Sequence, residues 1–467
     1  MIISGRLINM GKNIVCSILL SVVFLFFHFS GYYDFVLRLI ASIGLIPVIS
    51  MFILAIRTRE IRIVVMSVVL FQTWNMFLEP YMWKLPIISV YRVFYEEDFF
   101  LMALFSCLSI FALYIGFLWG IRRIKAKALY KPNFLSNKKL GKLLIGMILL
   151  GFVNSILSSL DLPLGIFSLI ETMLPSTVGA ITLLYWIRGG RSFILILFSL
   201  VYMICYFIYY VGGTLFIYSI FLVMAPTVIY IIEKKKIPYK VLTIVVILLL
   251  PIYLSRHSYR NEGLLARGIV RIQVGLHVIQ SEYSNISIEH WKDLLAAGEE
   301  NKNVDNRTEG VSYLGQLVQK INSGECKYLY GRTMIWFPTM IIPRFLIPFR
   351  PSQNMGDGWA IYYGLKDPTW RASINFPMLC EFYVNFGYWG MVIFSFINGL
   401  LIVWFMRKFN DGIGDSNLLL LIFLITKIIV VEANVSLAYG AVIQVIFICW
   451  FINRFFLHKS SVKAVNS

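Results

Sequence analysis

Long runs of hydrophobic residues, separated by short polar connectors, make up most of this chain. A membrane-spanning helix needs about 20 consecutive, mainly apolar residues. Twelve runs of suitable length occur, most with at most one charge. They lie at 14–31, 33–56, 61–78, 99–120, 143–160, 164–187, 192–211, 213–232, 238–255, 384–406, 416–433 and 439–457. The pattern predicts an all-α polytopic membrane protein with about 12 transmembrane helices.

One polar segment of 127 residues, 257–383, interrupts this pattern. It divides the chain into residues 1–256 with helices one to nine, the segment itself, and residues 384–467 with helices ten to twelve and a tail. Within it, 332–350 is apolar but contains three prolines, with Arg344 near the middle. An uninterrupted lipid-facing helix is excluded there, because each proline removes a backbone donor that lipid cannot replace. We expect helical parts and an interfacial or re-entrant segment.

The distribution of charge predicts the orientation of the chain in the membrane. Hydrophobic residues make up 59% of the chain and charged residues only 14%, and the net charge is +18. The 257–383 loop contains 13 Lys or Arg and 12 Asp or Glu, so nearly all of the excess lies in the short connectors. By the positive-inside rule, these connectors and both termini are cytoplasmic, and the loop is extracytoplasmic. This placement also argues against a nucleic-acid partner. The six cysteines are scattered, so we expect neither a disulfide framework nor a metal site.

The two ends of the loop carry the candidate chemistry. At the start, Arg256, Arg260, Arg267 and Arg271 are spaced by 4, 7 and 4 residues, which a continuous helix would gather within an arc of roughly 60°. Near the end, arginines alternate with aromatic residues: Arg344, Arg350, Trp359, Tyr362, Tyr363, Trp370, Arg371, Glu381 and Tyr383. Guanidinium groups bind phosphate oxygens, and aromatic rings stack on sugar faces. We expect the two ends to converge on one cavity, because the flanking helices pack together.

Three sequence strings and the loop between them carry a family resemblance. The order is RNEGL at 260–264, the long loop, IIPRFLIPFRP at 341–351, and NFPMLCEFYVNFGYWGM at 375–391. The chain resembles the Wzy-type oligosaccharide repeat-unit polymerases of bacterial O-antigen, capsule and exopolysaccharide assembly. The resemblance implies a C-type glycosyltransferase of the bacterial cytoplasmic (inner) membrane. Its substrates would be undecaprenyl-pyrophosphate-linked glycans at the outer leaflet, and it would need no cofactor. A chain-length regulator and a flippase are the implied protein partners.

This resemblance suggests roles for particular residues. We expect six arginines to neutralise the pyrophosphate as its bond to the sugar breaks: Arg260, Arg267, Arg271, Arg344, Arg350 and Arg371. Glu381 is the first candidate for the base that accepts the acceptor hydroxyl's proton, His277 the second and His257 the third. The competing interpretation is structural. Arginines at a membrane edge also bind lipid head groups, and Glu381 could simply pair with Arg371. Gly387 and Gly390 are expected to permit close helix packing.

Two other classes of protein fit parts of the pattern. A lipid-linked oligosaccharide flippase or transporter would also have twelve helices, but many transporters consist of two six-helix halves, and the large loop after helix nine does not divide the chain that way. An O-antigen ligase or a mannosyltransferase-like enzyme would differ in acceptor or in an acidic motif. Glu96, Glu97 and Asp98 lie where such a motif would bind a metal, but we favour a solvated acidic helix end there, because negative charge suits a helix N-terminus.

Overall fold

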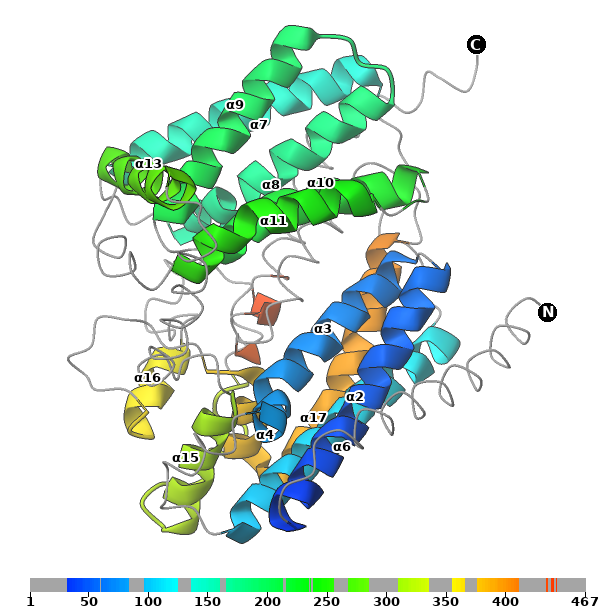
Figure 1. Ribbon diagram of the computed structural model, residues 1–467, viewed down its shortest axis with the longest axis vertical. Helices are drawn as coiled ribbons and strands as arrows, with labels where there is room; N and C mark the ends of the chain where they lie inside the picture. Colours follow the sequence, from blue (N-terminus) through cyan, green and yellow to red (C-terminus); the bar gives the residue numbers. More distant parts are fainter. Residues whose placement is uncertain are drawn as a thin grey trace. The chain divides into compact units, whose positions relative to one another are not determined.

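The structure is a computed structural model of the whole chain. It describes residues 32–58, 60–83, 96–124, 136–159, 165–212, 216–234, 236, 238–255, 268–284, 310–335, 355–365, 376–410, 434, 435, 438–440 and 442. These residues form helices and their connections, and no strand occurs among them (Figure 1).

Nine of the twelve predicted apolar runs have a helical counterpart in the described residues. These are α2 (Tyr32–Thr58), α3 (Ile61–Phe77), α6 (Glu96–Arg123), α7 (Asn137–Ser159), α8 (Gly165–Ile187), α9 (Phe193–Gly212), α10 (Phe216–Lys234), α11 (Tyr239–Ser255) and α17 (Met378–Asn410). Four are long and apolar enough to cross a membrane: Phe35–Thr58, Asp98–Arg123, Phe193–Gly212 and Met378–Arg407. The protein is therefore an all-helical membrane protein. The count of twelve stays a prediction, because 14–31, 416–433 and most of 439–457 lie outside the described residues.

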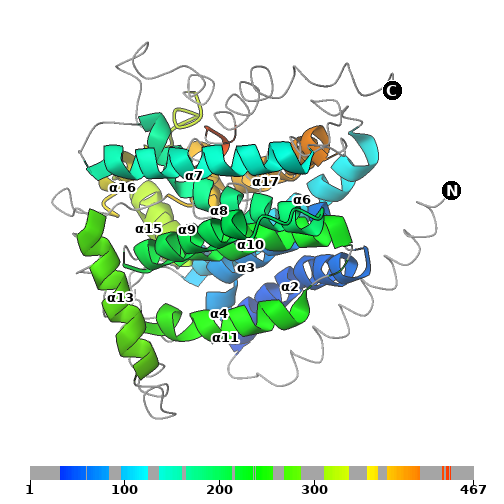
Figure 2. The same cartoon turned by 90° about the horizontal axis from the view of Figure 1, so that it is seen from above.

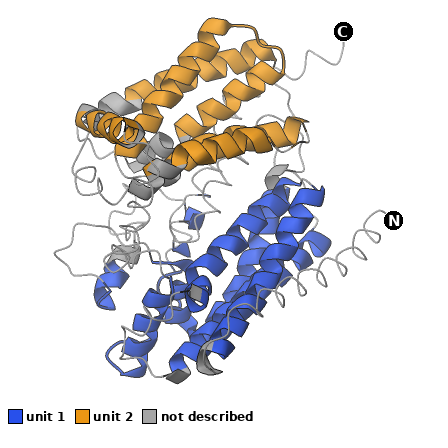
Figure 3. Ribbon diagram, in the orientation of Figure 1, with its two compact units in different colours: residues 1–131, 306–412, 427–467 blue, residues 132–305, 413–426 orange. Residues whose placement is uncertain are grey.

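The chain forms two compact units (Figure 3). Unit 1 comprises residues 1–131, 306–412 and 427–467, and unit 2 comprises residues 132–305 and 413–426. Unit 1 also contains α4 (Glu79–Trp83), α15 (Gly310–Asn322) and α16 (Met355–Tyr362), and unit 2 contains α13 (Gly268–Ser284). The predicted 257–383 loop is thus shared, since its first part belongs to unit 2 and the rest to unit 1.

In unit 1, α6 and α17 pack with their backbones almost in contact. A Cβ atom on Gly116 of α6 would lie 2.2 Å from the Phe396 carbonyl oxygen, and one on Gly399 of α17 would lie 2.3 Å from the Leu113 carbonyl oxygen. Gly116 and Gly120 form a GxxxG spacing, a sequence that lets membrane helices approach closely. Because no side chain fits between them at these points, glycine is required on both helices.

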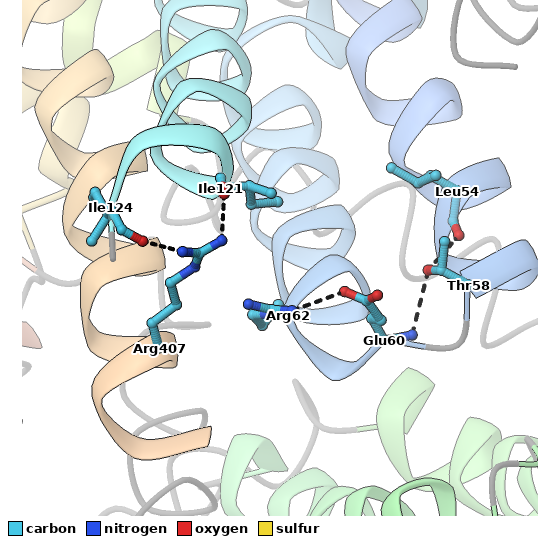
Figure 4. Close-up of polar contacts among 7 residues, drawn as sticks. All are labelled: Leu54, Thr58, Glu60, Arg62, Ile121, Ile124 and Arg407. Carbon is cyan, nitrogen blue, oxygen red and sulfur yellow. Dashed lines mark hydrogen bonds and ion pairs between the residues drawn. The ribbon is translucent and has the colours of Figure 1, made fainter. Parts of the chain in front are cut away.

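Arg407 fastens the same pair of helices at their carboxyl ends. Its guanidinium group donates hydrogen bonds to the carbonyl oxygens of Ile121 and Ile124 (Figure 4). The last carbonyls of a helix have no partner inside that helix and carry partial negative charge. A cation from α17 therefore caps α6. The start of α3, where Arg62 donates to Glu60 at 3.1 Å, is in the same view.

The other long helices of unit 1 have defined directions. Gly44 and Ser50 of α2 lie beside Cys107 and Tyr114 of α6, so α2 runs parallel to α6. The indole N–H of Trp74 near the end of α3 donates to the Ala41 carbonyl near the start of α2 at 2.9 Å, so α3 runs antiparallel to both. Gly399 of α17 lies beside Leu113 of α6 and Arg407 beside Ile124, so α17 runs parallel to α6. The basic residues at the end of α2, at the start of α3 and at the ends of α6 and α17 therefore lie at the same end of unit 1, which we call the basic end. The described segments of the 257–383 loop in unit 1 lie at the opposite end, which we call the loop end.

Unit 2 has a polar connection at one end and a crossing helix at the other. Asn137 at the start of α7 donates to the Arg188 carbonyl at 2.8 Å, and the Arg188 side chain pairs with Glu233 of α10 at 2.9 Å. At the other end, α13 packs on α9, α11 and α7. Val211, Ile252 and Val278 form a small buried cluster where α9, α11 and α13 meet.

We predict that alanine at either of the α6–α17 contact glycines destabilises the protein. Gly116→Ala or Gly399→Ala forces two backbones apart and is expected to cost about 1–3 kcal/mol. Gly146→Ala is the matched control, since nothing lies within 4 Å of its Cβ position. Alanine there should be neutral or stabilising by up to about 1 kcal/mol. Thermal unfolding midpoints in detergent measure the difference. Equal shifts in all three variants would contradict the close contact.

Candidate functional site

The site of interest in unit 1 begins with a break in α17. Phe386 (φ −141°, ψ 16°) and Gly387 (φ 67°, ψ −162°) leave the helical conformation, and the helix resumes after them. The positive φ of Gly387 favours glycine. The sequence predicted a helix from residue 384, whereas α17 starts at Met378. The first part, 378–385, was missed because it contains the polar residues Glu381 and Asn385 and is too short to register as a span.

The two glycines at this break have different roles. A Cβ on Gly390 would lie 2.5 Å from the Phe386 Cβ and 2.8 Å from the Phe382 carbonyl oxygen, so its small size allows the chain to fold back on itself. A Cβ on Gly387 would have ordinary contacts, 3.5 Å to the Tyr328 hydroxyl. The expected packing role therefore holds for Gly390, whereas Gly387 is needed for its backbone conformation.

Residues 326–335 form a loop that is bonded to the broken helix. Leu329 N–H donates to the Val384 carbonyl at 2.8 Å, and Gly331 N–H donates to Asn385 Oδ1 at 2.8 Å. Asn385 Nδ2 donates to Thr333 Oγ1 and to the Glu381 carbonyl, both at 2.7 Å. We call this set of bonds the loop clasp. It satisfies polar groups that the break removes from the helical ladder.

Helix α15 packs beside the loop clasp. It contacts α3, α6 and α17, and its buried residues include Val311, Leu314 and Leu317. Asn322 at its end donates to Asp98 in the first turn of α6 at 3.2 Å. The sequence predicted helical parts in the 257–383 loop, and α15 is one of them. Residues 285–309, which precede it, lie outside the described residues. The helix α6 starts at Glu96, as an acidic N-terminus predicts.

Glu381, the first candidate for the base, lies in the first turn of α17. It is only 1% exposed. Val435 N–H donates to its Oε2 at 2.6 Å, and Val435 opens a helical turn in which Ala438 N–H bonds to the Asn434 carbonyl. The Thr333 side chain of the loop also interacts with this carboxyl. Oε1 makes no hydrogen bond of standard geometry to a described residue. Val435 N–H thus fixes Oε2, and the Thr333 side chain lies beside the carboxyl.

Aromatic side chains surround this region. Tyr383 packs edge-on against Tyr328 and Tyr388, with ring centroids 6.0 Å and 5.0 Å apart. The Tyr363 hydroxyl donates to the Lys327 carbonyl at 2.9 Å, which ties α16 to the loop. Burial raises the pKa of Tyr363 and of the Cys326 thiol. Both groups are therefore neutral at physiological pH.

A small cavity lies beside the half-helix that carries Glu381. It has a volume of about 30 Å³, room for about two water molecules. Its lining residues are Val69, Thr73, Leu113, Met378, Leu379, Phe382, Ser395, Asn398, Ala438 and Tyr439. The Tyr439 hydroxyl donates to Asn398 Oδ1 there. The cavity is too small for a sugar or a pyrophosphate.

Two other candidates, Arg271 and His277, lie on α13 in unit 2. The Arg271 guanidinium carbon is 4.6 Å from the centroid of the Tyr209 ring, a cation–π contact. The His277 side chain is exposed. The predicted convergence of these residues with Glu381 stays a prediction, since they belong to different units.

The remaining candidates lie outside the described residues. They are Arg256, His257, Arg260, Arg267, Arg344, Arg350, Trp370 and Arg371. The predicted gathering of Arg256, Arg260, Arg267 and Arg271 on one helix face therefore stays a prediction, and so does the pairing of Glu381 with Arg371. The same holds for the interfacial segment beyond Ile335.

Comparison with protein-family models, with curated proteins and with solved structures found no match to this chain. The family resemblance rests on the sequence strings themselves.

Sequence reasoning missed Asn385, Thr333 and Val435. Asn385 could have been noticed as a polar residue between two apolar stretches, directly before Phe386 and Gly387. Val435 contributes only a backbone N–H, which no residue type indicates. Thr333 is an ordinary loop threonine in the sequence.

We predict that Asn385→Ala frees the loop. It removes the partner of Gly331 N–H and Thr333 Oγ1, at a cost of about 2–3 kcal/mol, or roughly 30- to 150-fold in the opening equilibrium. Alkylation of Cys326 measures that opening, because the thiol is buried in the closed loop and reacts as the thiolate. The rate should rise with pH in both proteins, since deprotonation becomes more frequent.

Asn322→Ala is the control, because it removes a single exposed hydrogen bond, to Asp98. Mutants in which Cys326 is the only cysteine keep the readout specific. If Asn385→Ala and Asn322→Ala accelerate the reaction equally, the loop clasp does not hold the loop.

Proposed function

We propose that this protein polymerises undecaprenyl-pyrophosphate-linked oligosaccharide repeat units at the outer face of a bacterial cytoplasmic membrane. It is a glycosyltransferase in which lipid pyrophosphate is the leaving group, and the loop end of unit 1 faces outward. The observation that carries the proposal is the buried carboxyl of Glu381, on a broken membrane helix and beneath a loop.

The break in α17 supports the proposal on physical grounds. Irregular backbone at membrane depth is tolerated where it is buried in protein or lines a cavity, and ion and substrate sites of membrane proteins are often built there. An ionisable residue in such a segment is a functional candidate. Glu381 meets both conditions, since it lies on the half-helix ahead of Phe386 and Gly387.

The hydrogen bonds of Glu381 suit a general base. Val435 N–H fixes Oε2 and thereby orients the carboxylate, while Oε1 remains for a proton. A base must come within hydrogen-bond reach of the hydroxyl that it deprotonates. Here the Thr333 side chain lies beside the carboxyl, so displacement of residues 331–333 would uncover it. The proposed cycle therefore opens the loop to admit an acceptor sugar.

The decisive experiment supplies the purified protein in proteoliposomes with lipid-linked repeat units alone. We expect a ladder of products on a gel, one repeat unit per step. Unchanged repeat units moved across the bilayer would indicate a flippase, and a product that forms only when lipid A is present would indicate a ligase. Alanine at Arg260, Arg344 or Arg371 should shorten or abolish the ladder, because each removes a donor proposed for the pyrophosphate.

We predict that Glu381→Gln lowers the rate of polymerisation by about 100-fold or more, the usual contribution of a general base. The amide oxygen can still accept the hydrogen bond of Val435 N–H, so the fold should survive. Glu325→Gln is the matched control, because Glu325 is exposed and pairs with Lys320. The rate of ladder formation and the thermal midpoint are measured together. Full activity of Glu381→Gln would leave Glu381 a purely structural role.

A further inference from the structure

Helix α9 indicates where the hydrocarbon core of the membrane lies along unit 2. Its 20 residues, Phe193–Gly212, span about 30 Å at 1.5 Å per residue, the thickness of the hydrocarbon core. Large apolar side chains are exposed along most of this length: Phe193 is 73% exposed, Phe198 62% and Ile204 57%. A helix of this kind is in contact with lipid over that surface.

Helix α13 crosses α9 where this exposed surface ends. A Cβ on Gly212 would lie 1.9 Å from the Arg271 carbonyl oxygen, and one on Gly275 would lie 2.2 Å from the Ile208 carbonyl oxygen. Figure 1 shows α13 nearly end-on beside α9, and Figure 2 shows it running crosswise to α7 and α9. A helix that runs crosswise to a spanning helix, at the end of the span, is placed to lie along the membrane surface.

The side chains of α13 are distributed as such a position requires. Gly275 and Val278 face the protein and are buried. On the opposite side, Gln273 and Gln280 are exposed. Apolar residues flank this polar strip.

These flanking residues are Val270, 56% exposed, and Leu276, 49% exposed. At 100° per residue, they lie on either side of Gln273 and Gln280. A helix on a bilayer keeps its polar strip in water and its apolar flanks at the acyl boundary. Tyr209, half-buried near the end of α9, is a residue type typical of the same layer.

We propose that α13 is a membrane-surface helix whose partner is the bilayer itself. Its axis lies in the plane of the membrane at the end of α9, Val270 and Leu276 rest among the head groups and upper acyl chains, and Gln273 and Gln280 face water. This proposal rests on α9 as a spanning helix and not on the proposed enzymatic function.

The test is a nitroxide scan of the full-length protein in vesicles of phosphatidylethanolamine and phosphatidylglycerol. Single labels are placed through Val270→Cys, Gln273→Cys, Leu276→Cys and Gln280→Cys, after replacement of the native cysteines. Collision with oxygen reports lipid, and collision with a water-soluble nickel complex reports water. We expect the oxygen-to-nickel ratio to be several-fold higher at 270 and 276 than at 273 and 280.

Ile204→Cys, labelled in the same way, supplies the deep reference. Two results would overturn the proposal. Equal, water-like values at all four positions would place α13 away from the bilayer, and values like that of Ile204 at all four would place it inside the hydrocarbon core. An environment-sensitive fluorophore at the same positions gives an independent reading, with blue-shifted emission expected at 270 and 276 only.

Discussion

Unit 1 depends on the contact between the backbones of α6 and α17. Membrane helices gain little hydrophobic energy by associating, because lipid is as apolar as their side chains. Close packing and polar bonds must hold them together instead. Gly116 and Gly399 bring the two backbones together, and Arg407 binds the free carbonyls at the end of α6. This pairing holds the second half of α17 against α6, and the half-helix that carries Glu381 precedes it along the chain.

The break in α17 and the loop that covers it are interdependent. A helix interrupted near a membrane loses backbone hydrogen bonds that lipid cannot replace. Leu329 N–H satisfies the Val384 carbonyl, and Asn385 binds both Gly331 and Thr333. Without the loop, the break would leave polar groups unsatisfied, and without the break, Asn385 could not reach the loop in this way. The part of the polar segment that folds onto unit 1 is therefore a component of the helical bundle.

The sequence predicted the apolar helices well, because length and hydrophobicity alone determine which segments can cross a membrane. It was less accurate at the start of α17, where a short polar half-helix precedes the span and tertiary bonds decide the boundary. The partner of Glu381 could not be predicted at all. Val435 lies 54 residues further along the chain and contributes only its N–H. Glu381 lies in the first turn of α17, close to the predicted start of that helix, whereas Asn385 and Thr333 become visible only when the loop is folded onto the helix.

The burial of Glu381 constrains how it could act. A carboxylate in an apolar setting is costly unless hydrogen bonds compensate. Val435 N–H provides one such bond, and the Thr333 side chain interacts with the same carboxyl. Because Thr333 belongs to the loop that Asn385 holds, release of the loop would take one hydrogen-bond partner away from the carboxyl. A few hydrogen bonds of about 1 kcal/mol net each set its cost, which is small enough for substrate binding to meet. Under the proposed function, the loop clasp would cover this carboxyl until an acceptor is present, and a purely structural glutamate has no need of such a removable cover.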